Sequence, residues 1–356
     1  MELIDTLCRV ATENGAEDLY LRQSEPPRLR IKGELLEIED TIFTDEDMTS
    51  FLDRCGYATV GNKKGMEVDL AWENNSGQRF RVNIYESMGS RSAVLRPLRK
   101  VSHTMEDLGL PVERLQNWFS RRSGLILFTG ATGSGKSTSL ASCINWVINN
   151  YKKHVVTIED PVEYMLDSNK SLVSQRQIGT DTNSFHDGLR ASLRQSPDVI
   201  FLGEIRDHET AKSALHACET GHLVVSTLHS SNVSETIQRL IMLFPAEERE
   251  GVVYVLAKQL LGIISQKLIP GLQSNLHLLL EHMENSGAVK QWIERGELSK
   301  ISDFLSSANQ GDNVTFIGSI IDAFKSGRIS EESARADCED PADFNRILLG
   351  VSHGSR

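Results

Sequence analysis

The stretch GATGSGKS, residues 130–137, follows the pattern G-x-x-x-x-G-K-[ST] and largely decides the fold. It is preceded by the apolar run GLILFT (124–129), which is typical of a buried strand. It runs into KSTSLASCINWVI (136–148), whose apolar residues repeat at helical spacing. A buried strand, a glycine-rich turn and a helix in this order indicate an α/β domain built on a parallel sheet.

The chemistry of this stretch predicts a phosphate-binding loop. Glycines let successive backbone N–H groups face inward around phosphate oxygens, next to the positive end of the following helix. A lysine adds positive charge for the β- and γ-phosphates, and the serine hydroxyl can ligate Mg²⁺. A chance match in a flexible loop is the alternative, which the flanking strand and helix disfavour. We expect ATP and Mg²⁺ to contact Gly130, Thr132, Gly133, Ser134, Gly135, Lys136 and Ser137.

Two more expected strands end in acidic residues. DVIFLGE (198–204) ends in Glu204, and a carboxylate near the loop can hold a Mg²⁺-bound water or polarise the attacking water. TIEDPVE (157–163) supplies Glu159, Asp160 and Glu163, and clustered carboxylates suit general-base work or the orientation of water. The alternatives are an acid that caps the next helix, for Glu204, and a solvated strand end, for the cluster.

Two histidines flank the expected strand His222–Thr227. Seven residues at about 3.3 Å each separate His222 from His229 by roughly 20 Å, so the pair is not a two-histidine metal site. His229 follows the strand, at the end where ligands bind in open α/β sheets. His222 starts the strand, and geometry alone favours a structural role for it.

Apolar spacing divides the 356 residues into four parts. An amphipathic helix over 1–20 and short alternating strands predict an α+β domain over 1–100, and 101–112 is the expected hinge. Residues 113–270 alternate strands with helices, and after Pro270 the helical periodicity predicts a small helical region, 271–356. The expected strands are 18–22, 28–31, 68–72, 79–85, 92–96, 124–129, 154–159, 198–203 and 222–227, and the expected core helices lie near 136–150, 184–195, 207–220 and 231–243.

Composition bounds the partners and the compartment. A net charge of −11 disfavours nonspecific binding to nucleic acid or anionic lipid. The five cysteines lie far apart without a C-x-x-C pair, which indicates reduced packing thiols rather than disulfides or a zinc site. No apolar run approaches the roughly 18 residues that span a bilayer, and the N-terminus lacks signal-peptide features. If the protein acts on a membrane machine, we therefore expect it to dock from the cytoplasm.

Four motifs stand in the order and spacing of a known family: GATGSGKST, TIEDPVEY, DVIFLGEIRD and TGHLVVSTLHSSN. They resemble the Walker A, Asp, Walker B and His boxes of the type II/IV secretion ATPases. DLYLRQSEPPRLRIKGEL and FRVNIYESMGSRSAVLR look like the PAS-like N-terminal domain of that family. The resemblance therefore implies a PAS-like α+β domain, a RecA-like P-loop ATPase core and a small C-terminal helical domain.

Three features favour the type IV pilus retraction branch, the PilT/PilU group. The chain is short, lacks the paired C-x-x-C motif of many extension ATPases, and carries GDNVTFIGSIIDAFKSGRISEESA, which looks like a PilT-type tail. LRQSPDVIFLGEIR, ISQKLIP and WIERGELSKISDF look closer to PilU. AVKQWI (288–293) departs from the AIRNLI typical of PilT. A PilU-like protein is therefore favoured over a PilT-like one.

The resemblance also implies roles for individual residues. Glu163 and Glu204 match catalytic glutamates, and Thr138 joins Lys136 and Ser137 in contacting phosphate and Mg²⁺. A guanidinium delivered across an interface would stabilise transition-state charge, although arginines of this kind are more often surface charges without the family context. The remaining matches are nucleotide-binding Glu159, Asp160 and His222, catalytic His229, the trans-acting arginines Arg81 and Arg96, and the weaker phosphate-sensor candidates Arg194, Arg206 and Arg239.

The implied function is a homohexameric ATP-hydrolysing motor for pilus retraction, with ATP between the N-terminal and P-loop domains. Its implied partners are an inner-membrane platform protein and a PilT-like ATPase, with no nucleic acid. An ATPase of a type II or type IVB secretion system is an alternative, and so is a regulatory nucleotide binder that hydrolyses poorly. A RecA-like nucleic-acid motor is a third, disfavoured because interleaved aromatic and basic residues are missing.

Overall fold

The computed structural model describes residues 2–56, 67–272, 275–306 and 313–338, together with Phe344, Asn345 and Leu348. The chain forms two compact units. The first consists of Met1–Lys100 and Glu163–Met165, and the second of Val101–Val162 and Leu166–Arg356. Among the described residues, no helix has the length and apolar character that crossing a membrane requires.

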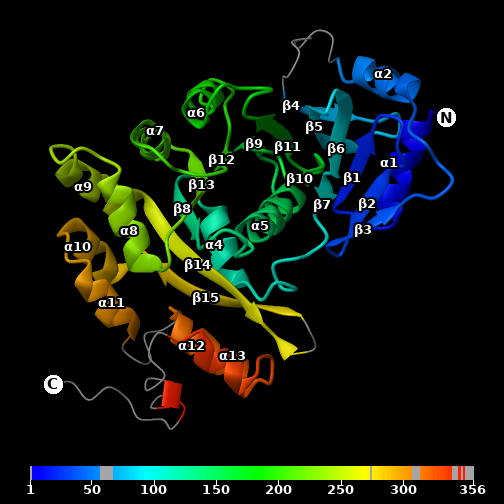
Figure 1. Ribbon diagram of the computed structural model, residues 1–356. Coiled ribbons are helices and arrows are strands. Elements are labelled where there is room, and N and C mark those ends of the chain that lie inside the picture. The colour runs from blue at the N-terminus through cyan, green and yellow to red at the C-terminus, as the bar shows by residue number, and fades with distance from the viewer. Residues whose placement is uncertain are drawn as a thin grey trace. The chain divides into compact units, whose positions relative to one another are not determined.

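In its described residues, the first unit is an antiparallel sheet with the helices α1 and α2 (Figure 1). Its strand order is β3-β2-β1-β6-β5-β4. Apolar residues on one face of the sheet, among them Leu19, Trp72 and Phe80, pack against the helices and form the core. The elements are α1 (Leu3–Glu13), β1 (Asp18–Arg22), β2 (Arg28–Ile31), β3 (Glu34–Glu37), α2 (Asp45–Arg54), β4 (Val68–Glu73), β5 (Arg79–Ser87), β6 (Ser90–Pro97) and β7 (Arg99–Lys100), with β10 (Tyr164–Met165) parallel to β7.

The first helix is shorter than the sequence predicts, since it ends at Glu13 instead of continuing to residue 20. Gly15 adopts a positive φ of 62°, which glycine alone reaches without strain. The N–H of Ala16 then bonds the carbonyl of Ala11 at 2.8 Å and closes the helix end. The chain is thereby released into β1 at Asp18.

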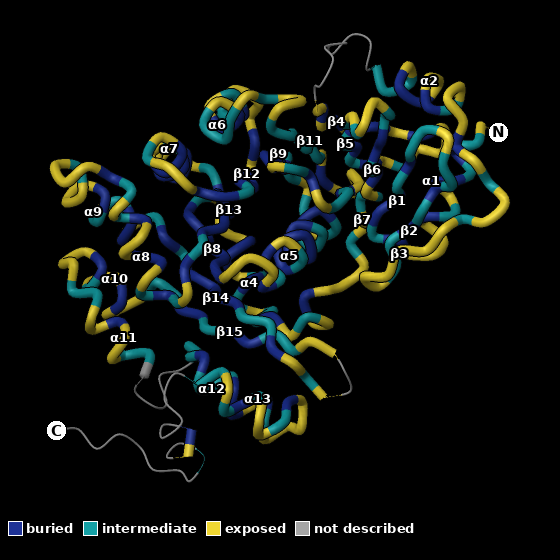
Figure 2. Tube along the Cα trace, viewed as in Figure 1, coloured by how far each residue is buried: buried dark blue, intermediate teal, exposed yellow. Residues whose placement is uncertain are grey.

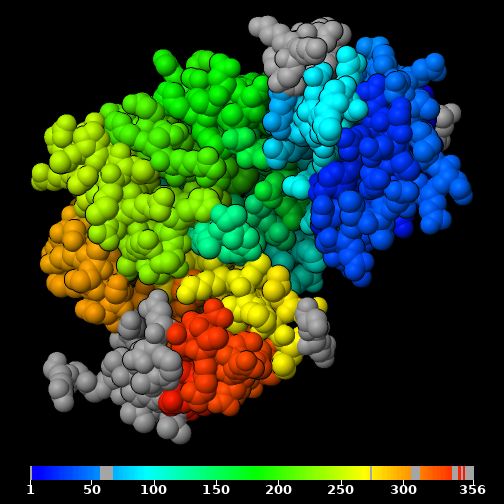
Figure 3. All heavy atoms as spheres, in the orientation of Figure 1, coloured from blue at the N-terminus to red at the C-terminus, as the bar shows by residue number. Residues whose placement is uncertain are grey.

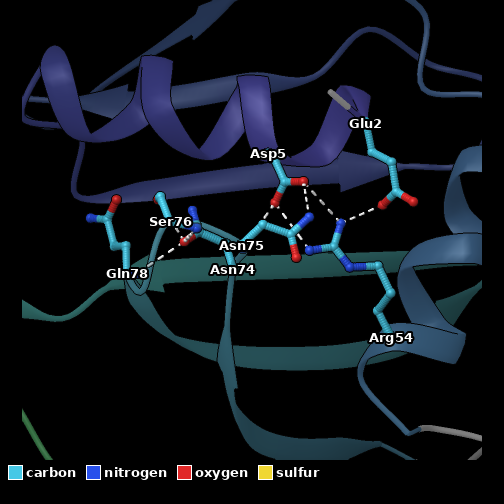
Figure 4. A network of polar contacts seen from close by, with 7 residues as sticks. All are labelled: Glu2, Asp5, Arg54, Asn74, Asn75, Ser76 and Gln78. Atoms are coloured by element: carbon cyan, nitrogen blue, oxygen red, sulfur yellow. Dashed lines mark hydrogen bonds and ion pairs between the residues drawn. The ribbon is translucent and has the colours of Figure 1, made fainter.

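A buried carboxylate joins the two helices to the β4–β5 turn (Figure 4). Asp5 of α1 is 7% exposed and accepts hydrogen bonds from Arg54 Nη2 at 3.0 Å and Asn75 Nδ2 at 2.8 Å. Arg54 also pairs with Glu2 and lies over the ring of Trp72. Burial alone would raise the pKa of Asp5, but the hydrogen bonds from Arg54 and Asn75 outweigh it and lower that pKa.

The second unit is built on a seven-stranded sheet of order β11-β9-β12-β13-β8-β14-β15. Neighbouring strands run parallel except β14 and β15, which are antiparallel. The strands are β8 (Gly124–Thr129), β9 (His154–Glu159), β11 (Leu172–Gln177), β12 (Val199–Leu202), β13 (Leu223–Leu228), β14 (Leu260–Pro270) and β15 (Leu276–Glu284).

Helices cover both faces of this sheet (Figure 1). Leu125 and Leu127 of β8 pack into one apolar layer, while Ile126 and Phe128 pack into the layer on the opposite face. Because both faces of the sheet are covered, every residue of β8 and β13 is buried, instead of every second one (Figure 2). The helices are α4 (Val112–Ser120), α5 (Lys136–Asn150), α6 (Phe185–Ser192), α7 (His208–Glu219), α8 (Val233–Met242) and α9 (Arg249–Gln259).

The prediction of a helical region from residue 271 is wrong in its first part, because β15 extends the sheet to Glu284. Its run LHLLLEHME packs apolar side chains on both faces, so it lacks the period of two that marks a half-buried strand. The chain beyond β15 is helical where it is described. The helices are α10 (Gly287–Glu294), α11 (Ser299–Ser306), α12 (Phe316–Lys325) and α13 (Glu331–Ala336), of which α12 and α13 pack against β14 and β15 (Figure 3).

The predicted hinge, residues 101–112, has no helix or strand before α4 begins at its last residue. Two of its side chains, Met105 and Leu110, are buried in the apolar core of the second unit. Its carboxyl-terminal part is therefore attached to the α4 face of the sheet. Its function as a hinge stays a prediction.

Candidate functional site

The phosphate-binding loop connects β8 to α5, as the sequence predicts. Gly130, Gly133 and Gly135 all have positive φ values, of 144°, 79° and 85°. A Cβ atom on Gly130 would lie 2.4 Å from the carbonyl oxygen of Gln266 in β14 and 2.5 Å from Ser134 Oγ. Glycine is therefore required at Gly130 both by its backbone conformation and by the strand beneath it.

Lys136 is the first residue of α5 and is buried. Its Nζ atom donates to the carbonyl oxygens of Gly130 and Ala131, both at 2.8 Å. The ammonium group is therefore held against the loop, where phosphate oxygens can take over these contacts. Ser134 Oγ is buried and has no hydrogen-bond partner in the described part of the chain, while Ser137 is exposed. These groups fit the phosphates of a nucleotide.

The strand order brings an acid and a histidine to the loop. β13 lies between β8 and β12, so His229 follows the strand next to the loop strand and Glu204 follows the one after it. Glu204 is 8% exposed, and its Oε2 atom lies 3.6 Å from His229 Nε2 and 2.5 Å from Arg206 Nε. The buried carboxylate of Glu204 thus has a histidine and an arginine as neighbours.

The electrostatics of His229 connect this acid to the loop. Burial lowers the pKa of His229, the positive charge of Lys136 lowers it further, and Glu204 acts in the opposite direction. Interaction with both groups means that Lys136, Glu204 and His229 lie in one neighbourhood at the carboxyl edge of the sheet. The imidazole is neutral at pH 7 and is able to accept a proton or a hydrogen bond.

A second acid lies at the same edge. Glu159 ends β9, which pairs in parallel with β12 through Ile158 and Leu202. Its side chain is 8% exposed and accepts hydrogen bonds from Thr157 Oγ1 at 2.6 Å and Gln175 Nε2 at 3.1 Å. Glu159 and Glu204 are therefore held at adjoining strand ends. Asp160, the next residue, is exposed.

Three predicted site residues belong to the first unit. Glu163 stands directly before β10 and is exposed. Arg81 and Arg96 lie directly opposite each other on β5 and β6. Arg96 forms a two-pronged pair with the buried Asp18, at 2.8 and 3.1 Å, and Arg81 Nη2 lies 3.7 Å from Asp69 Oδ1. Each arginine of this facing pair therefore has its own counter-charge.

His222 is not brought to the loop. It stands directly before β13, at the amino-terminal end of this strand. Its carbonyl oxygen accepts a hydrogen bond from the N–H of Gly124, the first residue of β8. Its Nδ1 atom lies 3.0 Å from the carbonyl oxygen of Ala217 and 3.2 Å from Thr220 Oγ1, at the end of α7. His222 therefore closes a helix end at the opposite edge of the sheet from His229, and its predicted contact with nucleotide stays a prediction.

The three weaker arginine candidates do not all lie near the phosphate-binding loop. Arg206 contacts Glu204, and the charge of Arg239 acts on His229, so both belong to the neighbourhood of the loop. Arg194 follows α6, and its Nη1 atom donates to the carbonyl oxygen of Arg190 at 3.3 Å. The described contacts of Arg194 give it no tie to the loop.

Sequence reasoning missed two glutamines at the site. Gln175 of β11 contacts Glu159, and Gln266 of β14 supports Gly130 and donates from Nε2 to Ser139 Oγ at 2.7 Å. Neither strand was predicted, because β11 is only partly buried and β14 runs without a break from α9. No residue-type signal singles out a glutamine within a strand.

A glycine-rich loop between a buried strand and a helix, faced by acids and a histidine from neighbouring strand ends, defines a P-loop nucleotide-binding protein. The family model described as type II/IV secretion system protein matches residues 1–301, and the chain belongs to this family. The predicted resemblance and the predicted α/β fold are confirmed by this match and by solved relatives.

Two curated relatives from Pseudomonas aeruginosa are similar over nearly their whole length. The type IV pilus retraction ATPase PilT is 33% identical over 347 residues, which cover 96% of this chain and 99% of PilT. The type IV pilus ATPase PilU is 31% identical over 349 residues, which cover 97% of this chain and 91% of PilU. These identities are too close to separate the two branches, so the PilU-like assignment stays a prediction.

Solved structures show the same likeness. The pilus retraction motor PilT with bound ADP is 36% identical, with a TM-score of 0.85 over 97% of this chain and 99% of that one. The ATPase DotB of Legionella pneumophila is 28% identical, with a TM-score of 0.72 over 94% of each chain. The chain therefore has the fold of a PilT-type ATPase.

Proposed function

We propose that this chain hydrolyses ATP to ADP and phosphate and that a homohexamer of it powers the retraction of type IV pili. The gathering of Lys136, Glu204 and His229 at the carboxyl edge of the sheet carries the proposal. A cationic phosphate ligand beside a buried acid is the minimum that phosphoryl transfer to water needs. The likeness to PilT and PilU over nearly the whole chain supports the assignment to pili.

The loop binds the triphosphate through its backbone N–H groups and the ammonium group of Lys136. The two hydrogen bonds of Lys136 to loop carbonyls are exchanged for charge-assisted bonds to phosphate oxygens. The hydroxyls of Ser137 and Thr138 and, through water, the carboxylate of Glu204 would hold Mg²⁺. When bound, Mg²⁺ neutralises charge on the β- and γ-phosphates.

The acids and the histidine are proposed to orient the attacking water. Glu204, which pairs with Arg206, accepts a hydrogen bond from the water, which orients an oxygen lone pair toward the γ-phosphorus. His229 stays neutral and steadies the same carboxylate. Glu163 is the second catalytic acid, and Glu159 and Asp160 contact the nucleotide from the neighbouring strand end.

Arg81 and Arg96 are proposed to reach the nucleotide of a neighbouring subunit. Arg81 and Arg96 face each other on one side of the sheet, where each is paired with its own carboxylate. Asp18 holds Arg96 in one orientation while 61% of the arginine side chain stays exposed. A guanidinium group positioned in this way is suited to stabilise charge on the transferred phosphoryl group.

The domain scheme stays a proposal. Residues 1–100 would form the PAS-like domain, 101–112 the hinge, 113–270 together with β15 the ATPase domain, and the chain that follows β15 the C-terminal region. Closure about the hinge during turnover would move a platform protein at the inner membrane, to which the cytoplasmic ring docks. A PilT-like partner ATPase is the proposed companion if the chain belongs to the PilU branch.

A secretion-system ATPase is the second candidate, favoured by the family model over residues 1–301, which is described as type II/IV secretion system protein. The loop and the acids would work in the same way in either setting. A deletion strain distinguishes them: excess immobile surface pili and lost twitching indicate a retraction motor, whereas normal pili with impaired protein export indicate a secretion motor. Bald cells would instead indicate a pilus assembly ATPase.

Phosphate release by the purified full-length chain tests the enzymatic claim. Glu204→Ala is expected to lower turnover by about a hundredfold or more, because the orienting acid is lost, and to leave ATP binding intact. A melting temperature close to that of the wild type shows that the variant folds. Normal turnover in Glu204→Ala would reject the assignment of the acid.

A further inference from the structure

The segment that carries Glu163 has an unusual place in the chain. The chain leaves the second unit after Val162, contributes Glu163–Met165 to the first unit, and returns to the second unit at Leu166. Within the first unit, β10 pairs in parallel with β7. The position of Glu163 therefore depends on how the two flanking residues, Val162 and Leu166, are held.

Two glutamines of β11 hold those ends. Gln175 Oε1 accepts a hydrogen bond from the backbone N–H of Leu166 at 3.0 Å. Gln177 Oε1 accepts one from the backbone N–H of Val162 at 3.4 Å. Residues two apart in a strand project from the same face, so the two carboxamides stand side by side. The backbone on both sides of the Glu163 segment is thereby bonded to one strand of the ATPase sheet.

Gln175 has a second contact, with an acid at the carboxyl edge of the sheet. Its Nε2 atom donates to Glu159 Oε1 at 3.1 Å, and the fully buried Thr157 donates to the same oxygen at 2.6 Å. A carboxamide donates and accepts at once, which neither a carboxylate nor an apolar side chain can do. Gln175 therefore links the buried carboxylate of Glu159 to the backbone of Leu166, which directly follows the segment Glu163–Met165.

The register of the sheet explains why this arrangement is rigid. Gln175 is paired with Thr157 and Gln177 with Glu159 across the parallel strands β11 and β9. All four side chains thus project from the same face, on which Val155 packs in the apolar layer that contains α5. Two alternate positions on each of the two strands therefore form one polar group on the face of the sheet that α5 covers.

We propose that Gln175 and Gln177 are positioning residues for ATP hydrolysis, which fix the segment bearing Glu163 and orient Glu159. This inference rests on the proposed function, since it assigns the glutamines to the acids of that reaction. Neither glutamine touches the reacting atoms. Their loss acts on the rate of the chemical step, because misplacing a catalytic group by about 1 Å costs much of its effect.

The experiment measures kcat for ATP and the Kd for the nonhydrolysable analogue adenylyl imidodiphosphate with Mg²⁺, using the full-length chain. Gln175→Leu and Gln177→Leu are each expected to lower kcat about tenfold and to change Kd less than threefold. Gln177→Glu keeps an acceptor for the N–H of Val162 but sets a second carboxylate opposite Glu159, so it is expected to recover only part of the lost kcat. Gln291→Leu, at an exposed position of α10, is the matched control and is expected to behave as the wild type.

A further variant keeps the test decisive if Gln175→Leu fails to fold. Gln175→Glu retains the acceptor for Leu166 but exchanges the donor to Glu159 for a second carboxylate, so kcat is expected to fall while melting stays within a few degrees of the wild type. Wild-type kcat in both Gln175→Glu and Gln177→Leu overturns the inference. Equal losses of kcat and analogue binding also overturn it. A wild type that binds but does not hydrolyse ATP refutes the proposed function instead.

Discussion

The Nε2 atom of His229 lies 3.6 Å from the Oε2 atom of Glu204, although the two residues follow different strands, β13 and β12. These strands pair in parallel, so their carboxyl ends meet at one edge of the sheet. Lys136 acts on the same imidazole from the first turn of α5. A phosphate ligand, an acid and a neutral imidazole thus come from three separate elements.

The neutral imidazole leads to the first prediction. His229→Gln removes the ring but retains a neutral polar group, and we expect kcat for ATP to fall by about ten- to a hundredfold, because Glu204 loses its ordered neighbour. The affinity for a nonhydrolysable ATP analogue should change less than threefold. His216→Gln, at an exposed site on α7, serves as the control. Equal kcat values in the two variants would show that His229 has no part in turnover.

The second prediction concerns the backbone of the loop. Gly130→Ala would force a Cβ atom to within 2.4 Å of the Gln266 carbonyl at a φ of 144°. We expect a loss of about 3 kcal/mol of stability and the loss of nucleotide binding, since β14 or the loop must move. Gly251→Ala in α9 meets open space and should be neutral or stabilise by about 0.5–1 kcal/mol. Urea unfolding and ATP titration of both variants measure the difference.

The third prediction concerns the buried carboxylate of the first unit. Arg54→Met leaves Asp5 buried without its cation, and we expect a loss of roughly 3 kcal/mol in the free energy of unfolding. Arg79→Met breaks an ion pair with Glu73 in which both side chains are about half exposed, so it should cost less than 1 kcal/mol. Similar urea midpoints for the two variants would contradict this reading of the network in Figure 4.

The fourth prediction is a pH dependence of stability in the second unit. Burial, with a smaller contribution from Arg114, lowers the pKa of His282 to about 3 from an ordinary value of 6.5. The unfolded chain therefore binds a proton that the folded chain rejects between pH 6.5 and 3, and stability falls as the pH falls through this window. The expected loss from this histidine is about 1.4 kcal/mol between pH 7.5 and 5.5.

A variant isolates that contribution. His282→Asn has no titrating ring, and its side-chain oxygen is placed to accept from Arg114 Nη1, which lies 2.9 Å from Nδ1 of the histidine. Its free energy of unfolding in urea should therefore vary less between pH 7.5 and 5.5 than that of the wild type. An unchanged pH dependence would mean that His282 is already accessible to protons in the folded protein.

The ATPase core was readable from the sequence because its signals are local. The strand Gly124–Thr129 and the helix 136–150 are found where apolar spacing places them, and Glu204 and His229 follow their strands as predicted. In contrast, α2 was missed because its three buried apolar residues, Met48, Phe51 and Leu52, are too few to reveal a period. Helix and strand are equally consistent with the apolar run that became β15.

The contacts between distant segments could not be predicted from the sequence, for a different reason. Nothing in local pattern shows that β14 supports Gly130 or that Gln175 reaches Glu159, since both depend on the order of strands in the sheet. The place of His222 illustrates the same limit. Motif similarity groups it with His229, whereas strand direction places the two at opposite edges.

Titration calorimetry of ATP with Mg²⁺ into the wild type and Lys136→Ala addresses the central claim that this loop grips a nucleotide triphosphate. The wild type should bind with a saturable heat, and the variant should bind at least about a hundredfold more weakly, because the ammonium charge at the phosphates is gone. Matching melting curves would show that the variant is folded. ATP binding that is absent from the wild type, or unchanged in Lys136→Ala, would contradict the account.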